Sequence, residues 1–475
     1  MWYDKLNNKR LWKIFTEISA IPRESGNEEG IRNYLLSWAE KNHIEASSDK
    51  KGNVYMKKEA SKGMEKLPPV ALQAHMDMVC VKKESSSHDF TKDPIKIKTD
   101  GIKVTASGTS LGADDGLGVA MILDILSDPE ASHGALEAIF TVEEETGLGG
   151  AYAIESDKIS ARRLINLDSE EEGIIYIGCA GGIDIEASMK LKYEKASGTA
   201  LSIKVSGLLG GHSGGEIHKG RANAIKILAR YLNRLPSFRI ASISGGTRHN
   251  VIPSTAEAVI TVDSKDIAIR MQKMLQEELR DEYSITDPGI KIEVKETELP
   301  SCVIKEKKSQ KIADMLFLAP HGVRTMSSKI EGIVETSDNL AIVNIAEDKL
   351  HVSFSVRGNT ESSKMALAYE ILTLLESFSF KAIAGGSYPA WEPDPSSKLA
   401  KETAAAYKKI TGRKASITAI HAGLECGIIN SLIPGMESIS IGPELRDVHS
   451  VNENVDAASA ERTAEFVKKM LPMLK

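Results

Sequence analysis

The sequence predicts an α/β fold in which a discontinuous domain, with a central mixed sheet flanked by helices, is interrupted by an inserted α+β domain. Short apolar runs rich in β-branched residues alternate with helical patterns towards both ends of the chain, which is typical of a sheet covered by helices on both faces. The middle of the chain instead follows a ferredoxin-like β-α-β-β-α-β order. With 475 residues, 41% of them hydrophobic, the chain is long enough for two or three cores.

Four apolar runs of the first domain each lead to ionisable residues. The runs cover residues 70–74, 136–142, 164–167 and 438–442. They are followed by His75 and Asp77, by Glu143, Glu144 and Glu145, by Asp168 and, after a short loop, by His449. Helical patterns over 116–126 and 397–410 separate them. Because ligands of open α/β sheets collect beyond the carboxyl ends of the strands, we expect these side chains to form one site.

The inserted domain is predicted from its order of elements. The first set comprises strands at 200–207, 239–244, 256–263 and 290–296 and helices at 221–235 and 266–283. A second, less regular set has helices near 308–318 and 362–378 and strands near 339–345 and 349–357. Gly-rich stretches at 179–182 and 385–387 look like the two crossings between domains. The prediction is therefore one domain of residues 1–184 and 386–475, interrupted by a domain of residues 185–385.

Composition narrows the environment in which the chain works. Charged residues make up 27% and the net charge is only -6, so neither nucleic acid nor an anionic membrane surface is favoured as a partner. No apolar stretch approaches the roughly 18 residues of a membrane span, and the N-terminus lacks the apolar core of a signal peptide. The four cysteines are far apart with no C-x-x-C pair, which indicates reduced thiols. We expect a soluble, cytoplasmic protein.

The ionisable residues at the strand ends have the chemistry of metal ligands. In His75-x-Asp77 the carboxylate can fix the ring of a metal-binding histidine. Asp114 lies in a Gly-rich loop directly before a helix, where its two oxygens can bridge two cations. Three consecutive glutamates at 143–145 are costly unless cations neutralise them. Nitrogen and oxygen donors without thiolate suit zinc, manganese or cobalt.

Taken in order, these motifs resemble those of a known superfamily. Its motifs match Ala74-His75-Met76-Asp77, Leu111-Gly112-Ala113-Asp114-Asp115-Gly116, Thr141-Val142-Glu143-Glu144-Glu145-Thr146-Gly147 and Asn166-Leu167-Asp168. The superfamily is that of the co-catalytic zinc aminopeptidases and carboxypeptidases, which includes peptidase T, the carnosinases and succinyl-diaminopimelate desuccinylase. More narrowly, residues 178–182, 421–427 and 440–443 resemble the bacterial aminoacyl-histidine (Xaa-His) dipeptidases, which also act on β-alanyl-histidine. The resemblance runs from residue 18 to His449, essentially the whole chain.

The resemblance implies a role for each residue of the site. Asp114, rather than Asp115, would bridge two metal ions, most simply two Zn²⁺, with Co²⁺ or Mn²⁺ as alternatives. One ion would add His75 and Asp168, and the other Glu145 and His449. Asp77 would orient His75, and Glu144 would be the general base that takes a proton from a metal-bridging water.

The resemblance also implies that the inserted domain is a lid that carries substrate-binding residues. His212, between glycines at 210–215, would stabilise the developing oxyanion, in its own chain or across a homodimer formed through the lid; a flexible surface loop is the alternative. Asn250 would contact substrate and Arg357 would hold its free carboxylate, although either side chain also suits a structural cap or a surface ion pair. Gly423 would belong to a backbone wall beside the substrate.

Together these expectations predict a dinuclear-metal dipeptidase that hydrolyses short unblocked peptides, above all Xaa-His dipeptides. An N-acyl-amino-acid deacylase or an aminotripeptidase on the same scaffold is the alternative among hydrolases. A non-catalytic binding protein is the alternative outside them. That last alternative predicts lost ligands or a lost base, whereas all are present in the sequence.

Overall fold

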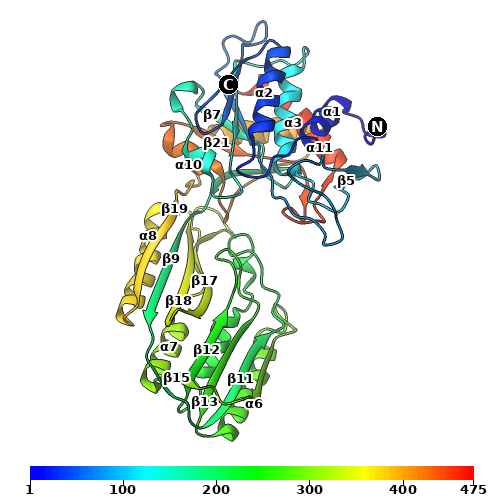
Figure 1. Cartoon of the computed structure of the whole chain (residues 1–475). Helices are drawn as coiled ribbons and strands as arrows, with labels where there is room; N and C mark the ends of the chain where they lie inside the picture. The colour runs from blue at the N-terminus through cyan, green and yellow to red at the C-terminus, as the bar shows by residue number, and fades with distance from the viewer. The chain divides into compact units, whose positions relative to one another are not determined.

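The computed structural model describes residues 1–475, which fold as two compact units. Unit 1 comprises Met1–Cys179, Trp391–Ala419 and Leu424–Lys475, and unit 2 comprises Ala180–Ala390 and Ile420–Gly423 (Figure 1). The α/β class and the combination of a mixed sheet with an inserted α+β unit are confirmed. No helix combines the length and the apolar character that a membrane span requires.

The central sheet of unit 1 is mixed and has eight strands. In sheet order these are β1 (Glu45–Ser48), β2 (Val54–Lys58), β6 (Leu136–Thr141), β3 (Val70–His75), β7 (Arg163–Asn166), β21 (Glu437–Ser440), β8 (Ile174–Cys179) and β20 (Ser416–Ile420). The four middle strands β6, β3, β7 and β21 are parallel, and β1, β2 and β8 pair antiparallel at the flanks. Every residue of β3 and β6 is buried, as expected for strands covered on both faces.

Helices surround this sheet, and some of them begin at side-chain caps. They are α1 (Lys9–Ser19), α2 (Glu29–Lys41), α3 (Ala113–Ser127), α4 (Gly149–Tyr152), α9 (Lys398–Thr411), α10 (Glu425–Leu432) and α11 (Ala457–Met470), with short 3₁₀ turns η1 (Ser156–Lys158) and η3 (Leu471–Met473). Asn8 caps α1 by accepting from the Leu11 N–H, and Asp456 caps α11 by accepting from the Ser459 N–H. The apolar α3 packs on β3 beneath α1 and α11. This packing fixes the first turn of α3 beside the end of β3.

A small four-stranded sheet completes unit 1. Its order is β22 (Leu445–Arg446), β23 (Asn454–Asp456), β5 (Lys103–Ala106) and β4 (Ile97–Thr99). The loop between β22 and β23 carries His449. Because β23 pairs with β5, the C-terminal part of the chain is anchored next to N-terminal segments.

Unit 2 is built on one antiparallel sheet. In order its strands are β14 (Lys291–Glu296), β11 (Thr199–Ser206), β13 (Ala256–Val262), β12 (Arg239–Gly245), β17 (Val334–Ala346), β18 (Lys349–Gly358), β9 (Gly181–Lys190) and β19 (Lys381–Tyr388), with β16 (Gly322–Met326) paired to β17. The helices are α5 (Ala224–Leu232), α6 (Lys265–Glu282), α7 (Glu306–Leu318) and α8 (Glu361–Ser377), the 3₁₀ turn is η2 (Ile217–Lys219), and β10 (Tyr193–Lys195) pairs with β15 (Cys302–Ile304). The helices and the sheet share one apolar core.

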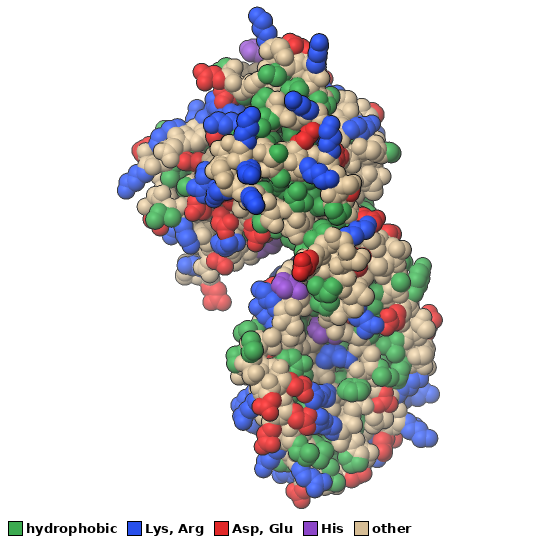
Figure 2. Space-filling model, turned by 180° about the vertical axis from the view of Figure 1, so that it is seen from behind, with side chains coloured by type: hydrophobic (Ala, Val, Ile, Leu, Met, Phe, Trp, Pro, Cys, Tyr) green, Lys and Arg blue, Asp and Glu red, His purple; other side chains and the backbone are tan.

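The first half of unit 2 has the predicted ferredoxin-like order, and β12 joins it to the second half by pairing with β17. Helix α8 lies against β9, β18 and β19 (Figure 1). Figure 2 shows basic and acidic side chains interspersed over the faces of both units that it presents.

The predicted domain boundaries differ from the observed ones in three places. The first crossing falls between Cys179 and Ala180 rather than after residue 184. The second falls after Ala390 rather than after residue 385, because residues 385–387 lie within strand β19, which pairs with β9. The short segment Ile420–Gly423 belongs to unit 2. Its His421 is held there by Ser337, whose Oγ lies 2.7 Å from His421 Nε2, and by Asn359.

Candidate metal centre

The five predicted metal ligands all lie in unit 1 and come together at one edge of its sheet. His75 ends β3, Glu145 follows β6, and Asp168 follows β7. Because these three strands are parallel neighbours, their carboxyl ends share an edge. Asp114 lies in the first turn of α3, and His449 reaches the same edge from the β22–β23 loop.

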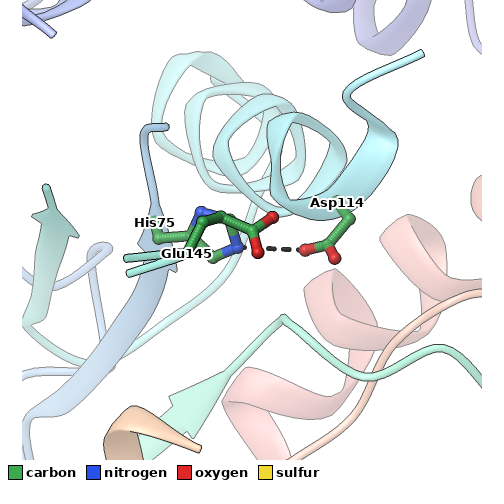
Figure 3. A group of neighbouring side chains, drawn as sticks. All are labelled: His75, Asp114 and Glu145. Carbon is green, nitrogen blue, oxygen red and sulfur yellow. Dashed lines mark hydrogen bonds and ion pairs between the residues drawn. The ribbon is translucent and has the colours of Figure 1, made fainter. Parts of the chain in front are cut away.

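Asp114 lies between two histidines, with one carboxylate oxygen directed at each. Its Oδ1 is 3.0 Å from His75 Nε2, the pair joined by a dashed line in Figure 3. Its Oδ2 is 3.0 Å from His449 Nε2. A second acid accompanies each histidine: Asp168 Oδ1 lies 3.5 Å from His75 Nε2, and Glu145 Oε2 lies 2.9 Å from His449 Nε2. The arrangement is two His-plus-carboxylate halves that share Asp114.

Asp115 is the competing candidate for the bridge, since it also lies near His75 and Asp168. Its oxygens, however, are occupied by main-chain donors. Oδ2 accepts from the His75 N–H at 3.2 Å and Oδ1 accepts from the Gly118 N–H at 3.0 Å. The geometry therefore favours Asp114 as the shared ligand and gives Asp115 a part in holding the end of β3.

The electrostatics of this edge favour cations. Burial alone would lower the pKa of His75 and of His449, but the surrounding carboxylates outweigh it and hold both pKa values well above the ordinary range. Burial also raises the pKa of Asp168 to about 6. Glu145 Oε1 is buried without a hydrogen-bond partner. A site of imidazole and carboxylate donors with an orphaned buried oxygen fits divalent metal ions of the zinc, cobalt or manganese type.

Asp77 fastens two of the ligand-bearing segments to each other. Its Oδ1 lies 3.4 Å from His75 Nδ1 and accepts from the Glu144 N–H at 3.1 Å. Its Oδ2 accepts from the Glu145 N–H at 3.2 Å and from Ser25 Oγ at 2.6 Å. Although burial acts to raise the pKa of Asp77, His75 and these donors lower it to about 2. Asp77 is therefore an ionised group beside the His75 ring and an acceptor that fixes the loop after β6.

The three consecutive glutamates have three different surroundings. Glu143 turns outward to an ion pair with Lys51, with 2.5 Å between Oε2 and Nζ. Glu145 faces His449, as described above. Glu144 is partly buried beside the centre, where burial raises its pKa well above the ordinary value. Of the three, only Glu144 is both close to the centre and outside the two His-plus-carboxylate halves.

Three buried charged residues near the centre received no role from the sequence. Glu425, at the start of α10, accepts from Gln73 Nε2 at 2.5 Å and from Thr141 Oγ1 at 2.7 Å, and burial raises its pKa to about 7. Arg23 and Glu453 both contact the loop that precedes α3. Glu425 lies inside the stretch 421–427 that carries the family resemblance, and Arg23 lies near residue 18, where the resemblance begins. Nothing in the sequence around Glu453 indicates its contacts.

The four predicted substrate-binding residues lie together in unit 2. A Cβ placed on Gly214 would lie 3.0 Å from His212 Cε1 and 3.1 Å from Arg357 Cζ. The main-chain oxygen of Asn250 accepts from the Ser213 N–H at 2.9 Å. Arg357 Nη1 donates to Tyr388 Oη at 2.7 Å, and the Tyr388 ring packs against Gly423. The guanidinium of Arg357 is buried without an ion-pair partner, and its Nε has no hydrogen-bond acceptor.

Comparison with known proteins identifies the class. Residues 71–472 match Peptidase family M20/M25/M40, so the chain belongs to this family of metallopeptidases. Within it, the chain is 37% identical over 462 residues to the cytosol non-specific dipeptidase of Escherichia coli (strain K12), covering 96% of this chain and 95% of that protein. The crystal structure of aminoacylhistidine dipeptidase from Vibrio alginolyticus matches with a TM-score of 0.88 and 34% identity, covering 100% of this chain and 98% of that chain.

A more distant structure shares the fold. A tripeptidase from Staphylococcus aureus matches with a TM-score of 0.59 and 16% identity over 99% of both chains. The family match and the relatives from E. coli and V. alginolyticus confirm the predicted resemblance to metallopeptidases that include dipeptidases.

Proposed function

We propose that this chain is a dipeptidase that uses two metal ions to hydrolyse short unblocked peptides, with Xaa-His dipeptides as preferred substrates. The observation that carries the proposal is Asp114, whose two oxygens each face a histidine with its own acidic partner. The names of the relatives from E. coli and V. alginolyticus support a dipeptide substrate. The proposed preference for histidine rests on the name of the V. alginolyticus relative and on the motif resemblance.

In this proposal each half of the centre holds one ion. His75 and Asp168 hold the first, Glu145 and His449 hold the second, and Asp114 is common to both. Zn²⁺ is the resident ion we propose, since the donors are nitrogen and oxygen. Two such ions, when bound, acidify water between them and polarise a peptide carbonyl. The His449 side chain is 48% exposed while that of His75 is 1% exposed, so we propose that substrate approaches the half that contains His449.

Glu144 is the general base of the proposed reaction. It lies beside the centre without belonging to either half, so its carboxylate is available to take a proton from the attacking water and to deliver it to the leaving amine. The main-chain N–H of Glu144 is fixed by Asp77, which limits the positions that the side chain can reach. Asp77 thereby contributes to the orientation of the base as well as of His75.

The substrate-binding residues of unit 2 complete the proposal. Arg357 is a buried cation without a carboxylate partner and with a free Nε–H. Its guanidinium is therefore able to bind the terminal carboxylate of a peptide. His212 stays a prediction as the donor to the developing oxyanion. Asn250 and Gly423 stay predictions as substrate contacts.

Replacing Arg357 with Lys is expected to weaken hydrolysis of a free dipeptide. Lys keeps the charge but loses the bidentate fork. A hydrogen bond to a charged group contributes about 1.5–3 kcal/mol, so kcat/KM should fall by about 10-fold or more, mainly through KM. The same dipeptide with an amidated C-terminus should be a poor substrate of both forms and lose little. Arg324→Lys, in an exposed ion pair with Glu370 of the same unit, is the matched control. Equal losses for the free and the amidated peptide would contradict this role.

A substrate panel tests the proposed function. Purified protein is assayed with β-alanyl-histidine and other dipeptides, with tripeptides, and with N-acetyl amino acids. The proposal predicts hydrolysis of dipeptides with the highest kcat/KM for Xaa-His. Preference for N-acetyl amino acids would instead identify a deacylase, preference for tripeptides an aminotripeptidase, and no hydrolysis at all a binding protein.

We also propose a cytoplasmic location and a homodimer for this protein. A cytoplasmic location is supported by the name of the E. coli relative, and detection of the protein outside the cytoplasm on cell fractionation would contradict it. A homodimer through unit 2 follows from the family resemblance alone, and light scattering of the purified protein would decide it.

A further inference from the structure

Arg23 is a buried cation that joins the segment carrying His75 to the loop carrying Asp114. Its side chain is buried, with 1% of the residue exposed. Nη1 donates to the main-chain oxygens of Met76 and Asp77 at 2.9 and 2.8 Å, directly after His75. Nη2 donates to the main-chain oxygen of Gly112, two residues before Asp114. No carboxylate of the chain forms an ion pair with Arg23. Its hydrogen bonds instead join the segment after His75 to the loop before α3.

Glu453 is the matching buried anion, and it joins the same loop to the segment carrying His449. Only 3% of the residue is exposed. Its carboxylate accepts the N–H groups of Leu111 and Gly112 at 2.7 and 3.0 Å and that of Ala113 at 2.8 Å. The N–H of Asp114 lies 3.4 Å away. These amides lie just before and at the start of α3 and have no acceptor within the helix, so Glu453 supplies the acceptor that they need.

Two glycines fit the loop closely to Arg23. A Cβ on Gly112 would lie 2.5 Å from Arg23 Nη2, and a Cβ on Gly116 would lie 2.6 Å from the same atom. Gly112 also has φ +68°, a conformation that favours glycine. The guanidinium therefore packs directly on the backbone on both sides of Asp114. Movement of Asp114 away from this position would break contacts with both Arg23 and Glu453.

The energetics point to positioning rather than to stability alone. Taking a guanidinium and a carboxylate out of water is costly, and buried ionic groups are weak evidence of stabilisation. What these two groups achieve is specific: each ties one half of the candidate centre to Asp114. Because the acidic side chains of the centre repel one another, their loops need such fixed attachments if the ligands are to be in place before the ions arrive.

We propose that Arg23 and Glu453 are positioning residues that pre-assemble the two halves of the metal centre around Asp114. Arg23 sets the half that contains His75, and Glu453 sets the half that contains His449. The inference rests on the proposed function in one respect, namely that the centre holds two ions. It assigns to both residues an effect on metal affinity, which a role in folding alone would not produce.

The test is zinc binding by the full chain, measured by titration against a competing chelator with the bound metal counted by mass spectrometry. Arg23→Lys keeps the charge but loses the fork that reaches three carbonyls. Glu453→Gln places an amide group against main-chain donors. Each variant is expected to bind at least one zinc ion about 10–100-fold more weakly than wild type, the range for residues that support metal ligands.

The matched control is Glu137→Gln. Glu137 is a buried carboxylate of the same unit that accepts the Ser160 and Ala161 N–H groups, each at 3.0 Å, at the opposite end of β6. Its substitution should lower the melting temperature and leave zinc affinity unchanged. If the first variants do not fold, Glu453→Asp, which keeps the charge but shortens the reach, and Gly116→Ala, which displaces the Arg23 guanidinium, serve in their place with the same expected loss.

The outcomes are distinguishable. Folded Arg23 and Glu453 variants that bind two zinc ions with wild-type affinity would overturn the inference and leave the proposed function intact. A loss of affinity in Glu137→Gln equal to that in the two variants would also overturn it, because the effect would then be one of stability. A wild-type chain that does not bind two ions would contradict the proposed function itself.

Discussion

Replacing Glu144 with Gln is expected to lower kcat by about 10²- to 10⁴-fold, the usual contribution of a general base, while two metal ions remain bound. Gln keeps the size of the side chain but cannot take the proton from the attacking water. The ligands are unaffected because Glu144 belongs to neither half of the centre. The measurement is kcat for a dipeptide together with the metal content of the same sample.

The chain supplies the control for this experiment in the adjacent residue. Glu143 has the same charge but forms an outward ion pair with Lys51, so Glu143→Gln should retain activity close to that of wild type. If Glu144→Gln retained substantial activity, or if it lost its metal ions, the assignment of Glu144 as the base would be wrong. A loss in Glu143→Gln as large as that in Glu144→Gln would point to the loop rather than to the proton acceptor.

Asp114→Asn is expected to have the second large effect, acting on the metal content first. An amide offers one acceptor oxygen, so it cannot face both histidines as the carboxylate does. One face would present an N–H to a cation. The protein should therefore lose at least one of its two ions. Since an ion contributes several kcal/mol to stabilisation of the transition state, kcat should fall by at least about 10²-fold.

Asp124 lies on the same helix and provides the matched comparison for Asp114. It is fully buried and pairs with Arg10 and Lys468. Asp124→Asn should lower the stability of the protein and leave two ions bound. If Asp114→Asn also kept two ions, Asp114 would not be the shared ligand, and Asp115 would become the residue to test.

Much of the candidate site could be predicted from the sequence because most of its residues follow parallel strands of the central sheet. His75, Glu145 and Asp168 each follow a buried apolar run, and parallel strands bring such positions to one edge. The local pattern therefore carries tertiary information for these three residues. The run at 438–442 also predicts His449 at this edge, after a short loop. In the structure β22 lies between this strand and His449, so the local pattern fixes its place less closely.

Other features depend on contacts that no local pattern encodes. Glu453 reaches the amides before α3 from more than 300 positions away in the sequence, and any surface loop could carry the same residues. The Gly-rich stretch at 385–387 predicts a crossing because glycine permits bends, yet main-chain pairing with β9 keeps it in strand β19. The sequence predicts that residues 420–423 belong to unit 1, but they belong to unit 2, where the side-chain partners of His421 lie in β17 and beyond β18.

We propose that two metal ions, which share Asp114 as a ligand, are required for peptide hydrolysis. The most direct measurement is to strip the protein with a chelator, confirm by circular dichroism that it remains folded, and return Zn²⁺ stepwise while the hydrolysis of one dipeptide is followed. We expect no activity without metal and a rise in activity that is complete at two zinc ions per chain. Hydrolysis by the metal-free protein, or full activity with a single ion bound, would contradict it.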